Sequence, residues 1–338
     1  MKIKLLTAFA FAASFFAVSC QKDMSADSDL VQATFTIVSP DEVATKAVAD
    51  GLKSKNLVFA VFPYDINAED NSTVSELRSL RQGDWNDASA TEITFNGNRE
   101  AIVNVTLVRG KAYQFVCWAQ KKELQCYDFS DMSAIKVSYE GEVSQNEDRD
   151  AFYALDTTKT APNKPVVVTK GFTQTITLRR PFAQVNMGAS DMKQAKMAGL
   201  DTTKVNSSMV VKGVANQLNT LTGEAVGTVD ASFTRALAIT NEAGTENLYI
   251  NDDPTAYGWL AMNYVLVNTK ESLQTKTHEV TVELFDEDQS LVSYDVTQVT
   301  LARNYRTHLV GDVLTTNAQL NVVIDPFFYN DDIVKEVE

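Results

Sequence analysis

Apolar and polar residues alternate along most of the chain beyond residue 30. In VQATFTIV (31–38), Val31, Ala33, Phe35 and Ile37 fall at every second position, as they do in a strand with one buried face. Similar runs, rich in valine, threonine and aromatic residues, favour strands, and clusters of Gly, Asn and Asp separate them. The expected strands are 31–38, 56–62, 101–108, 112–120, 134–139, 172–178, 183–187, 207–214, 258–267, 278–285, 290–301, 306–313 and 319–325.

Helical patterns are few. Residues 190–199 combine a Ser/Asp start with good helix formers and a closing glycine, and residues 72–80 are a second candidate. So few helices exclude a parallel βαβ fold and predict an all-β chain of antiparallel sandwiches. The length suits two such units, and we place them at residues 30–175 and 176–338. Four side chains are expected to help fill the first core: Phe35, Ile37, Phe59 and Val61.

The first twenty residues predict where the protein resides. Lys2 and Lys4 precede an apolar stretch over 5–18, which is too short to span a bilayer as a helix. Small residues and then Cys20 follow, an order typical of a bacterial lipoprotein signal peptide (1–19) whose cysteine is lipidated. The alternative is an ordinary secreted protein cut near Ala17. Lipidation predicts stable attachment to a membrane.

Residues 20–29 are polar and acidic, and we interpret them as a flexible tether between the lipid and the first sandwich. The chain as a whole carries a net charge of −14. Such a surface repels nucleic acid, which excludes DNA and RNA as expected partners.

Two cysteines remain beside Cys20. Cys117 and Cys126 lie on either side of a polar loop and could face each other across a hairpin. A disulfide is possible outside the cytoplasm, and two buried thiols are the alternative; the sequence leaves both open.

The sequence contains no arrangement of residues typical of catalysis or of a metal site. Its two histidines, His278 and His308, fall in alternating strands, and the His-Glu at residue 278 lacks a second histidine four positions on. Nucleophile-elbow, P-loop and dinucleotide-binding motifs are absent. We therefore expect no enzymatic activity, no metal and no cofactor other than the lipid on Cys20.

Four aromatic residues raise a second possible function. Trp118, Tyr257, Trp259 and Tyr264 could form a platform on which sugar rings stack, although aromatic residues in alternating strands are more often core.

Several stretches resemble the fimbrillin superfamily of Bacteroidota, and particularly a lipoprotein family within it. The most specific are LRRPFAQVNMG (178–188) and LARNYRTHLVGDVLT (301–315), supported by EDRDAFYA (147–154), ATKAVADG (44–51) and the cysteine-terminated signal. This resemblance implies two tandem transthyretin-like β-sandwiches. It also implies assembly by strand exchange, in which a protease removes the first strand and a strand of another subunit fills the resulting groove.

In this sequence the matching cut would fall between Lys46 and Ala47, with Lys where the family usually has Arg; an uncut lysine in an exposed loop is the alternative. The incoming donor strand is expected from the C-terminal region. One candidate is residues 333–338, with apolar Ile333, Val334 and Val337. Residues 319–325 alternate better and are expected to be the last strand of the chain's own sandwich.

These observations together predict a lipoprotein of the outer membrane, exposed at the cell surface. It would be a structural or adhesive fimbrial subunit, or a fimbrial anchor or accessory protein, with other fimbrial subunits as partners and a host or glycan ligand as a further possibility. The alternative function is that of a glycan-binding accessory lipoprotein in a polysaccharide-uptake system.

Overall fold

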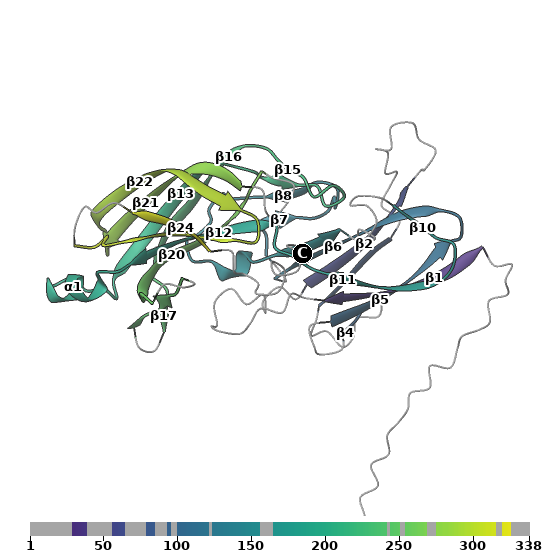
Figure 1. The fold of residues 1–338 in the computed structure, drawn as a ribbon, viewed down its shortest axis with the longest axis horizontal. Coiled ribbons are helices and arrows are strands. Elements are labelled where there is room, and N and C mark those ends of the chain that lie inside the picture. The colour runs from purple at the N-terminus through teal and green to yellow at the C-terminus, as the bar shows by residue number, and fades with distance from the viewer. Residues whose placement is uncertain are drawn as a thin grey trace, which may run out of the picture.

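The computed structural model describes residues 29–38, 56–64, 79–84, 93–95, 100–121, 124–155, 165–241, 244–250, 254–268, 275–315 and 320–325. These residues form an elongated all-β molecule (Figure 1), with the N-terminal strands at one end and the C-terminal strands at the other. The expected all-β architecture is therefore confirmed.

The N-terminal sandwich consists of two sheets. In the first, the strand order is β11-β1-β5-β4; in the second it is β10-β6-β2-β3, with β9 also paired to β6. The strands are β1 (Leu30–Val38), β2 (Asn56–Tyr64), β3 (Ser79–Asp84), β4 (Ile93–Phe95), β5 (Glu100–Val108), β6 (Ala112–Gln120), β9 (Phe152–Leu155), β10 (Val166–Val167) and β11 (Phe172–Thr177).

The C-terminal sandwich has the sheet orders β19-β20-β12-β23-β24 and β16-β13-β21-β22. Its strands are β12 (Phe182–Ala189), β13 (Val205–Val214), β16 (Val229–Leu237), β19 (Asn247–Leu248), β20 (Tyr257–Leu266), β21 (Thr275–Asp286), β22 (Gln289–Ala302), β23 (Arg306–Gly311) and β24 (Asn321–Asp325). A small hairpin of β17 (Thr240–Asn241) and β18 (Gly244–Thr245) extends from it, and the predicted helix is present as α1 (Met192–Met197).

The two sandwiches share one topology, which the sequence did not reveal. In each, the first strand lies between an antiparallel and a parallel neighbour: β1 between β5 and β11, and β12 between β20 and β23. The other strand pairs of both sandwiches are antiparallel, as expected, whereas the parallel pairing of β1 with β11 and of β12 with β23 was not expected. When the chain crosses to the other sheet and back, a later strand can lie beside the first strand and run in the same direction. The alternation of apolar and polar residues along a strand does not indicate the direction of its neighbours.

A third small sheet links the two halves of the molecule. The chain between β6 and β9 carries β7 (Tyr127–Asp128), β8 (Ile135–Val137) and the 3₁₀ turn η1 (Glu147–Arg149). There β8 pairs with β14 (Gln217–Leu218), which pairs with β15 (Ala225–Val226). The segment from 124 to 150 therefore leaves the N-terminal sandwich and packs on the C-terminal one. The proposed division between residues 175 and 176 falls inside β11, and 178–181 connect the sandwiches.

Strand β6 shows why these halves form a continuous structure. All nine of its residues are buried. One face, with Phe115 and Cys117, packs into the core of the N-terminal sandwich, which also holds all four core residues expected from the sequence. The opposite face, with Val116 and Trp118, belongs to a second core that runs through the C-terminal sandwich. Because both faces of the strand are covered, its sequence is apolar almost throughout.

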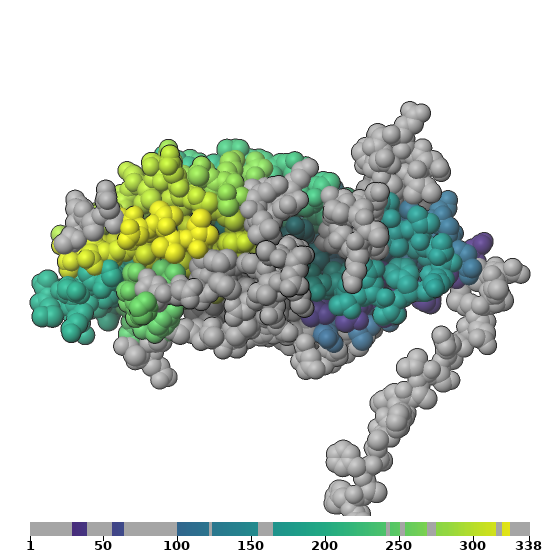
Figure 2. All heavy atoms as spheres, viewed as in Figure 1, coloured from purple at the N-terminus to yellow at the C-terminus, as the bar shows by residue number. Residues whose placement is uncertain are grey.

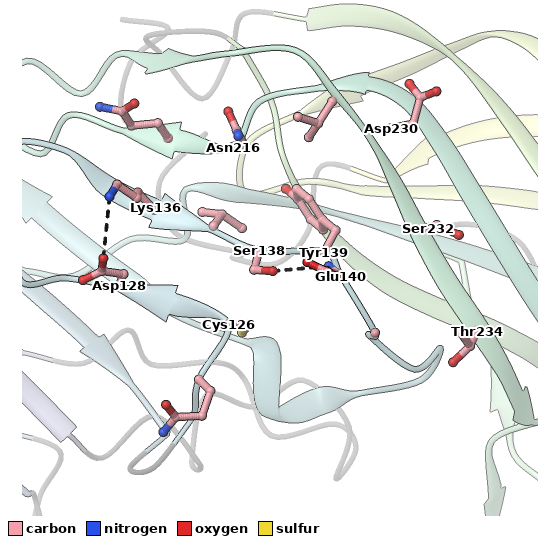
Figure 3. A pocket seen from close by; sticks show the side chains of 15 residues that line it. Cys126, Asp128, Lys136, Ser138, Tyr139, Glu140, Asn216, Asp230, Ser232 and Thr234 are labelled. Atoms are coloured by element: carbon pink, nitrogen blue, oxygen red, sulfur yellow. Dashed lines mark hydrogen bonds and ion pairs between the residues drawn. The ribbon is translucent and has the colours of Figure 1, made fainter.

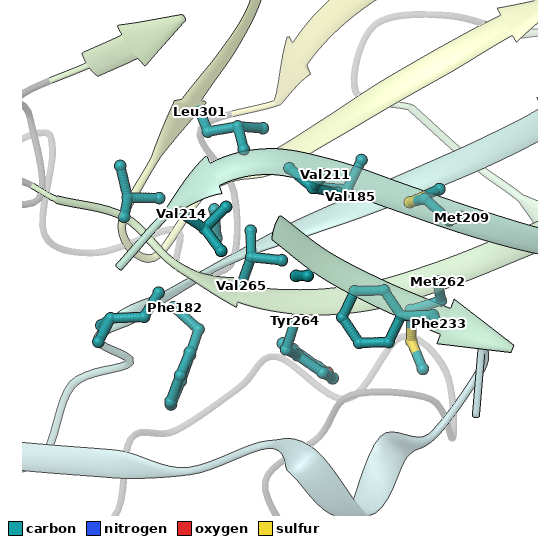
Figure 4. Packing of buried hydrophobic residues seen from close by; sticks show 14 of the residues in the cluster. Phe182, Val185, Met209, Val211, Val214, Phe233, Met262, Tyr264, Val265 and Leu301 are labelled. Carbon is teal, nitrogen blue, oxygen red and sulfur yellow. The ribbon is translucent and has the colours of Figure 1, made fainter. Parts of the chain in front are cut away.

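The larger core fills the space between the sheets of the C-terminal sandwich (Figure 4). The residues of this core include Val185 of β12, Val211 and Val214 of β13, and Val265 of β20. All the strands expected from alternation are present, including the last, which is β24. Strand β16 was not expected, although its buried Ala231 and Phe233 alternate with exposed polar residues. The possible helix at 72–80 lies outside the described residues apart from the start of β3.

Candidate functional site

Strand β1 lies in the interior of its sheet, although it is the first strand in the chain. All nine of its residues pair antiparallel with β5, from Leu30 opposite Val108 to Val38 opposite Glu100. Its other edge pairs in parallel with β11. In Figure 2 the purple atoms of this strand lie beside the teal atoms of β11. Both edges of β1 are therefore occupied by strands that come from much later in the sequence.

The inner face of β1 contributes directly to the core. Val31, Ala33, Phe35 and Ile37 alternate toward it, and the last three are fully buried. Phe35 lies at the centre of an aromatic cluster, and its ring centroid is 4.5 Å from that of Phe115. The other rings in contact with it are Phe59 at 4.9 Å and Phe172 at 5.6 Å. Burial of a phenylalanine of this kind contributes about 1.5–3 kcal/mol to stability.

The outer face of β1 is polar and fixes the register of the strand. Gln32 Nε2 donates to Thr106 Oγ1 at 2.8 Å, and Thr34 Oγ1 donates to Asn104 Oδ1 at 2.8 Å. Both pairs join residues directly opposite each other on β1 and β5. A slip by one residue would expose Phe35 and bury these polar groups, so the alternation specifies a single register.

Gly171 permits the close approach of β11 to β1. A Cβ atom built at Gly171 would lie 2.8 Å from the backbone carbonyl oxygen of Gln32. A backbone atom cannot move aside as a flexible side chain can, so glycine is required at this point for parallel pairing.

Loss of β1 would leave a defined groove. The facing backbone groups of β5 and β11 would lose their partners, and the sites now filled by Phe35 and Ile37 would become apolar pockets at alternate positions. Unpaired strand edges with such pockets bind an extended segment by β-augmentation. In the described structure β1 fills this groove along both of its edges.

Most of the site residues expected from the sequence lie outside the described residues. These are the lipidation residue, the two residues at the possible cut and the possible donor residues: Cys20, Lys46, Ala47, Ile333, Val334 and Val337.

Cys117 and Cys126 are buried thiols. Cys117 packs in the N-terminal core and Cys126 in the larger core, so the body of the second sheet separates them. Burial raises the pKa of the Cys126 thiol to about 11, against the opposing charge of Arg149. Because the thiolate is the nucleophile, this cysteine is unreactive at neutral pH.

The aromatic residues considered as a sugar platform belong to the core. Trp118 and Tyr264 are fully buried, and Trp259 is 4% exposed. The indole Nε1 of Trp259 donates to Asn186 Oδ1 at 3.0 Å, and that of Trp118 donates to Gln120 Oε1 at 2.8 Å. Tyr257 is partly buried against the same core. Three of these four rings are therefore inaccessible to a sugar, and Tyr257 alone does not make a platform.

The two histidines are buried as well. Nδ1 of His278 lies 2.8 Å from the carbonyl oxygen of Lys212. Burial lowers the pKa of His278, so its imidazole is neutral at pH 7. Among the described residues, no group of three or more His, Cys, Asp or Glu side chains is arranged to hold a metal ion.

Three buried arginines lie in the three most distinctive sequence motifs. Arg149, Arg180 and Arg303 are each about 1% exposed. Arg180 forms a two-point ion pair with Asp150, with its Nε 2.5 Å from Oδ1 and its Nη2 2.7 Å from Oδ2. Because Arg180 precedes β12 and Asp150 precedes β9, the pair fixes the start of one sandwich to the other.

Arg149 occupies an aromatic cage between the third sheet and β16. Its guanidinium lies over the rings of Tyr127, Tyr139 and Phe233, with centroid distances of 5.7, 5.1 and 5.8 Å. Nη1 of Arg149 is 3.0 Å from a carboxylate oxygen of Glu142. The three motifs thus supply the buried arginines, and the sequence around Arg149, which lies between Asp148 and Asp150, gave no local sign that its side chain is buried.

No helix among the described residues is both long and apolar enough to cross a membrane.

The fold defines the protein as an all-β protein of two sandwiches, with the first strand of each held between a parallel and an antiparallel partner. The chain belongs to a protein family of unknown function, DUF6562, whose sequence model matches residues 26–338. No protein with a curated function matches the sequence.

Solved structures with a similar chain path come from Bacteroidota. A DUF1812 protein of Bacteroides thetaiotaomicron has 12% identity and a TM-score of 0.47, over 88% of this chain and 96% of that one. The fimbrial anchor protein Mfa2 of Porphyromonas gingivalis has 10% identity and a TM-score of 0.39, over 88% of this chain and 98% of that one. The tip fimbrial protein Mfa3 of the same organism, in a C-terminally truncated form, has 10% identity and a TM-score of 0.41, over 88% of this chain and 99% of that one.

Proposed function

We propose that this chain is a non-enzymatic fimbrial subunit or fimbrial anchor of the cell surface, which acts by β-strand complementation in its N-terminal sandwich. The observation that carries the proposal is the placement of β1 in the middle of a sheet, between β5 and β11. The linker from residue 39 to 55 follows this strand and includes Lys46 and Ala47. A cut there would leave β1 attached to the sandwich by non-covalent contacts alone.

The geometry of β1 supports the proposed strand exchange. Its pairing with both neighbours and its buried Phe35 would be lost together, so the emptied groove would bind a replacement strand with apolar residues at alternate positions. A strand donated head to tail by another subunit does not close a ring and would give a filament. We propose other fimbrial subunits as the partners, with residues 333–338 as the donor from this chain if it extends the filament.

We also propose attachment to the outer membrane through a lipid on Cys20. The support is the sequence alone: a positive start, a short apolar stretch and a cysteine, followed by a polar tether. Each buried acyl methylene contributes about 0.8 kcal/mol to membrane binding, so two or more chains make the attachment stable. A fimbrial anchor would need this attachment to hold the filament on the cell, and it would have to keep the bond after Lys46 uncut, because a cut there separates Cys20 from both sandwiches.

Limited proteolysis of the full chain with a lysine-specific protease tests the exchange. Cleavage after Lys46 should release the peptide that contains β1, and SDS-resistant oligomers should form as it leaves. Because Lys53 and Lys55 also lie between β1 and β2, the tested chain and its control both carry Lys53→Gln and Lys55→Gln. The control adds Lys46→Gln, which should keep β1 attached and the chain monomeric. Oligomers that form equally from the control, or a cut chain that keeps β1 and never binds an added strand, would refute the proposal.

Intact mass of the protein purified from membranes tests the anchor separately. An acylated N-terminus at Cys20 is expected, and Cys20→Ala should move the protein from the membrane fraction to the soluble one. Membrane retention of the Cys20→Ala protein would rule out the lipid anchor and leave strand exchange unaffected.

A further inference from the structure

A notch opens on the C-terminal sandwich, far along the chain from β1. It is a cavity of about 880 Å³, within the range of about 300–1,000 Å³ usual for ligand sites. One wall is the outer edge of β16, and the other is the chain that runs from β8 to Gly141 (Figure 3). We call this cavity the β16 notch. The lining residues on which the argument below depends are Asp128, Lys136, Ser138, Glu140, Asp230 and Ser232.

The β16 notch exists because a parallel strand ladder stops early. Thr234 of β16 donates its N–H to the carbonyl of Glu142 and accepts at its own carbonyl from the N–H of Ser144. These bonds form one parallel bridge between Val143 and Thr234. Gly141 then turns with a φ of +70°, and the chain diverges toward β8. Beyond the bridge, nothing among the described residues continues the ladder along β16.

Two residues of β16 therefore have backbone groups that face the notch. Backbone N–H and C=O groups alternate sides along a strand, and those of Thr234 point outward to Glu142 and Ser144. Those of Ser232 and Asp230, two and four residues earlier, point to the same outward side. Their neighbours Ala231 and Phe233 pair with β13 on the other side. This edge has the geometry to accept hydrogen bonds from an added strand.

The charges around this edge indicate what kind of strand would fit. Asp128, Glu140 and Asp230 contribute three negative charges, against one positive charge from Lys136. Lys136 is already paired with Asp128, with Nζ 3.9 Å from Oδ2. Asp230 accepts a hydrogen bond from the backbone N–H of Gly213 through Oδ1. Glu140 and Asp230 thus hold negative charge on opposite walls, which favours a basic side chain between them.

A glycan fits the β16 notch less well than a peptide. Carbohydrate sites commonly offer an aromatic face on which a sugar ring stacks. The one aromatic side chain of this notch is Tyr139, which is 6% exposed. Its ring packs against Phe233 and Arg149, and its hydroxyl accepts from Leu266 N–H and donates to the carbonyl of Ala215. The notch instead offers an unpaired strand edge and negative charge.

We propose that the β16 notch binds an extended, basic peptide segment of a partner polypeptide, which adds to β16 as a strand beside Ser232 and Asp230. This interaction surface is independent of β1 and of the strand exchange proposed above. It would allow the C-terminal sandwich to contact a second protein while the N-terminal sandwich is engaged in assembly.

Binding of labelled peptides to the full chain tests this proposal. The probe is a short fluorescent peptide of alternating threonine and lysine, and the matched probe has glutamate in place of lysine. We expect saturable binding of the lysine peptide and none of the glutamate peptide. Glu140→Gln combined with Asp230→Asn removes two charges while Asn keeps the acceptor for Gly213, and should weaken binding about tenfold or more.

Ser232→Pro separates strand addition from simple charge attraction. Proline removes the outward N–H of Ser232, for which the described residues supply no acceptor on that side of β16, so the protein should fold normally. It should lose binding of the lysine peptide, whereas Ser232→Ala keeps the N–H and should retain it. If the Ser232→Pro protein does not fold, the Glu140→Gln, Asp230→Asn double variant still tests whether the β16 notch binds the lysine peptide.

Three results would overturn the proposal. The first is that the lysine and glutamate peptides bind equally well, or that neither peptide binds at millimolar concentration. The second is full binding by Ser232→Pro. The third is displacement of the lysine peptide by the oligosaccharide maltoheptaose, which would assign the notch to a glycan.

Discussion

Arg180 and Asp150 join the two sandwiches through a buried, two-point ion pair. Nε and Nη2 of the arginine donate to the two carboxylate oxygens at 2.5 and 2.7 Å, and the side chains are 0% and 3% exposed. The guanidinium also lies over the ring of Phe152, with its carbon 4.8 Å from the centroid. The pair couples the segment before β9 to the segment before β12, so it controls how the sandwiches meet.

Removal of one partner of this pair should be costly. Arg180→Met leaves the Asp150 carboxylate buried without its counter-charge, and we expect a loss of about 3–5 kcal/mol in the free energy of unfolding. The double variant Arg180→Met with Asp150→Leu should recover much of that loss. Urea unfolding followed by fluorescence measures both. Equal stability of the single variant and the unmodified protein would contradict this role.

Substitution of Gly171 should loosen β1 specifically. In Gly171→Ala the new methyl group would meet the carbonyl oxygen of Gln32 at 2.8 Å, so β1 or β11 must shift. We expect a loss of about 1–3 kcal/mol and faster release of β1 after proteolysis. Thr173→Ala, at an exposed position of β11, is the matched control. Hydrogen exchange of the β1 amides is the direct measurement, and unchanged protection would count against the prediction.

A chain that begins at Ala47 should be restored by a peptide. It lacks β1, and a synthetic peptide of residues 30–38 should bind the groove and raise the melting temperature of the shortened chain. The same peptide with Phe35→Glu should not, because it would bury a charge among Phe59, Phe115 and Phe172. If the shortened chain is as stable alone as the full chain, the groove does not need a strand.

His278 should make stability depend on pH. Burial, more than the nearby charge of Lys276, lowers its folded pKa below the unfolded value of about 6.5. As pH falls below about 6.5, the unfolded chain binds a proton that the folded chain does not, so stability decreases toward the folded pKa. The difference in unfolding free energy between pH 7.5 and 5 should be smaller in His278→Gln. An identical pH profile of the variant would exclude this histidine as the cause.

Cys126 should resist alkylation in the folded protein. Its pKa of about 11 leaves almost no thiolate at pH 7.5, and the side chain is 5% exposed. In a Cys20→Ala background, iodoacetamide should modify neither Cys117 nor Cys126 until denaturant is added, after which both should react. Intact mass reads the result, and a denatured protein with no reactive thiols would reveal a disulfide instead.

Much of the fold could be predicted because a strand with one buried face has apolar residues at every second position of its sequence. Strand β1 is the clearest case, with Phe35 and Ile37 inward and Gln32 and Thr34 outward. In the third sheet, β8 was predicted, whereas the short strands β7, β14 and β15 escaped prediction. Two residues are too few to show a period, and their pairing depends on distant partners such as Lys136 and Gln217.

The functional arrangement could be predicted only in part. Sequence motifs marked the segments that hold Arg149, Arg180 and Arg303, but nothing local indicates that a charged side chain is buried or with what it pairs. The aromatic residues Trp118 and Trp259 show the reverse difficulty. A sugar platform and a core position have the same sequence pattern, and the surrounding sheets decide between them.

The sequence by itself determined the all-β class, the positions of the long strands and the inward face of β1, because these follow from side-chain chemistry along a single strand. Only the tertiary structure decided that β1 lies between β5 and β11, that β12 repeats this arrangement, and that β16 ends its ladder at an open notch. Those features depend on which strands meet in space and in which direction, and hydrogen bonds between backbones form without regard to the identity of the side chains they join.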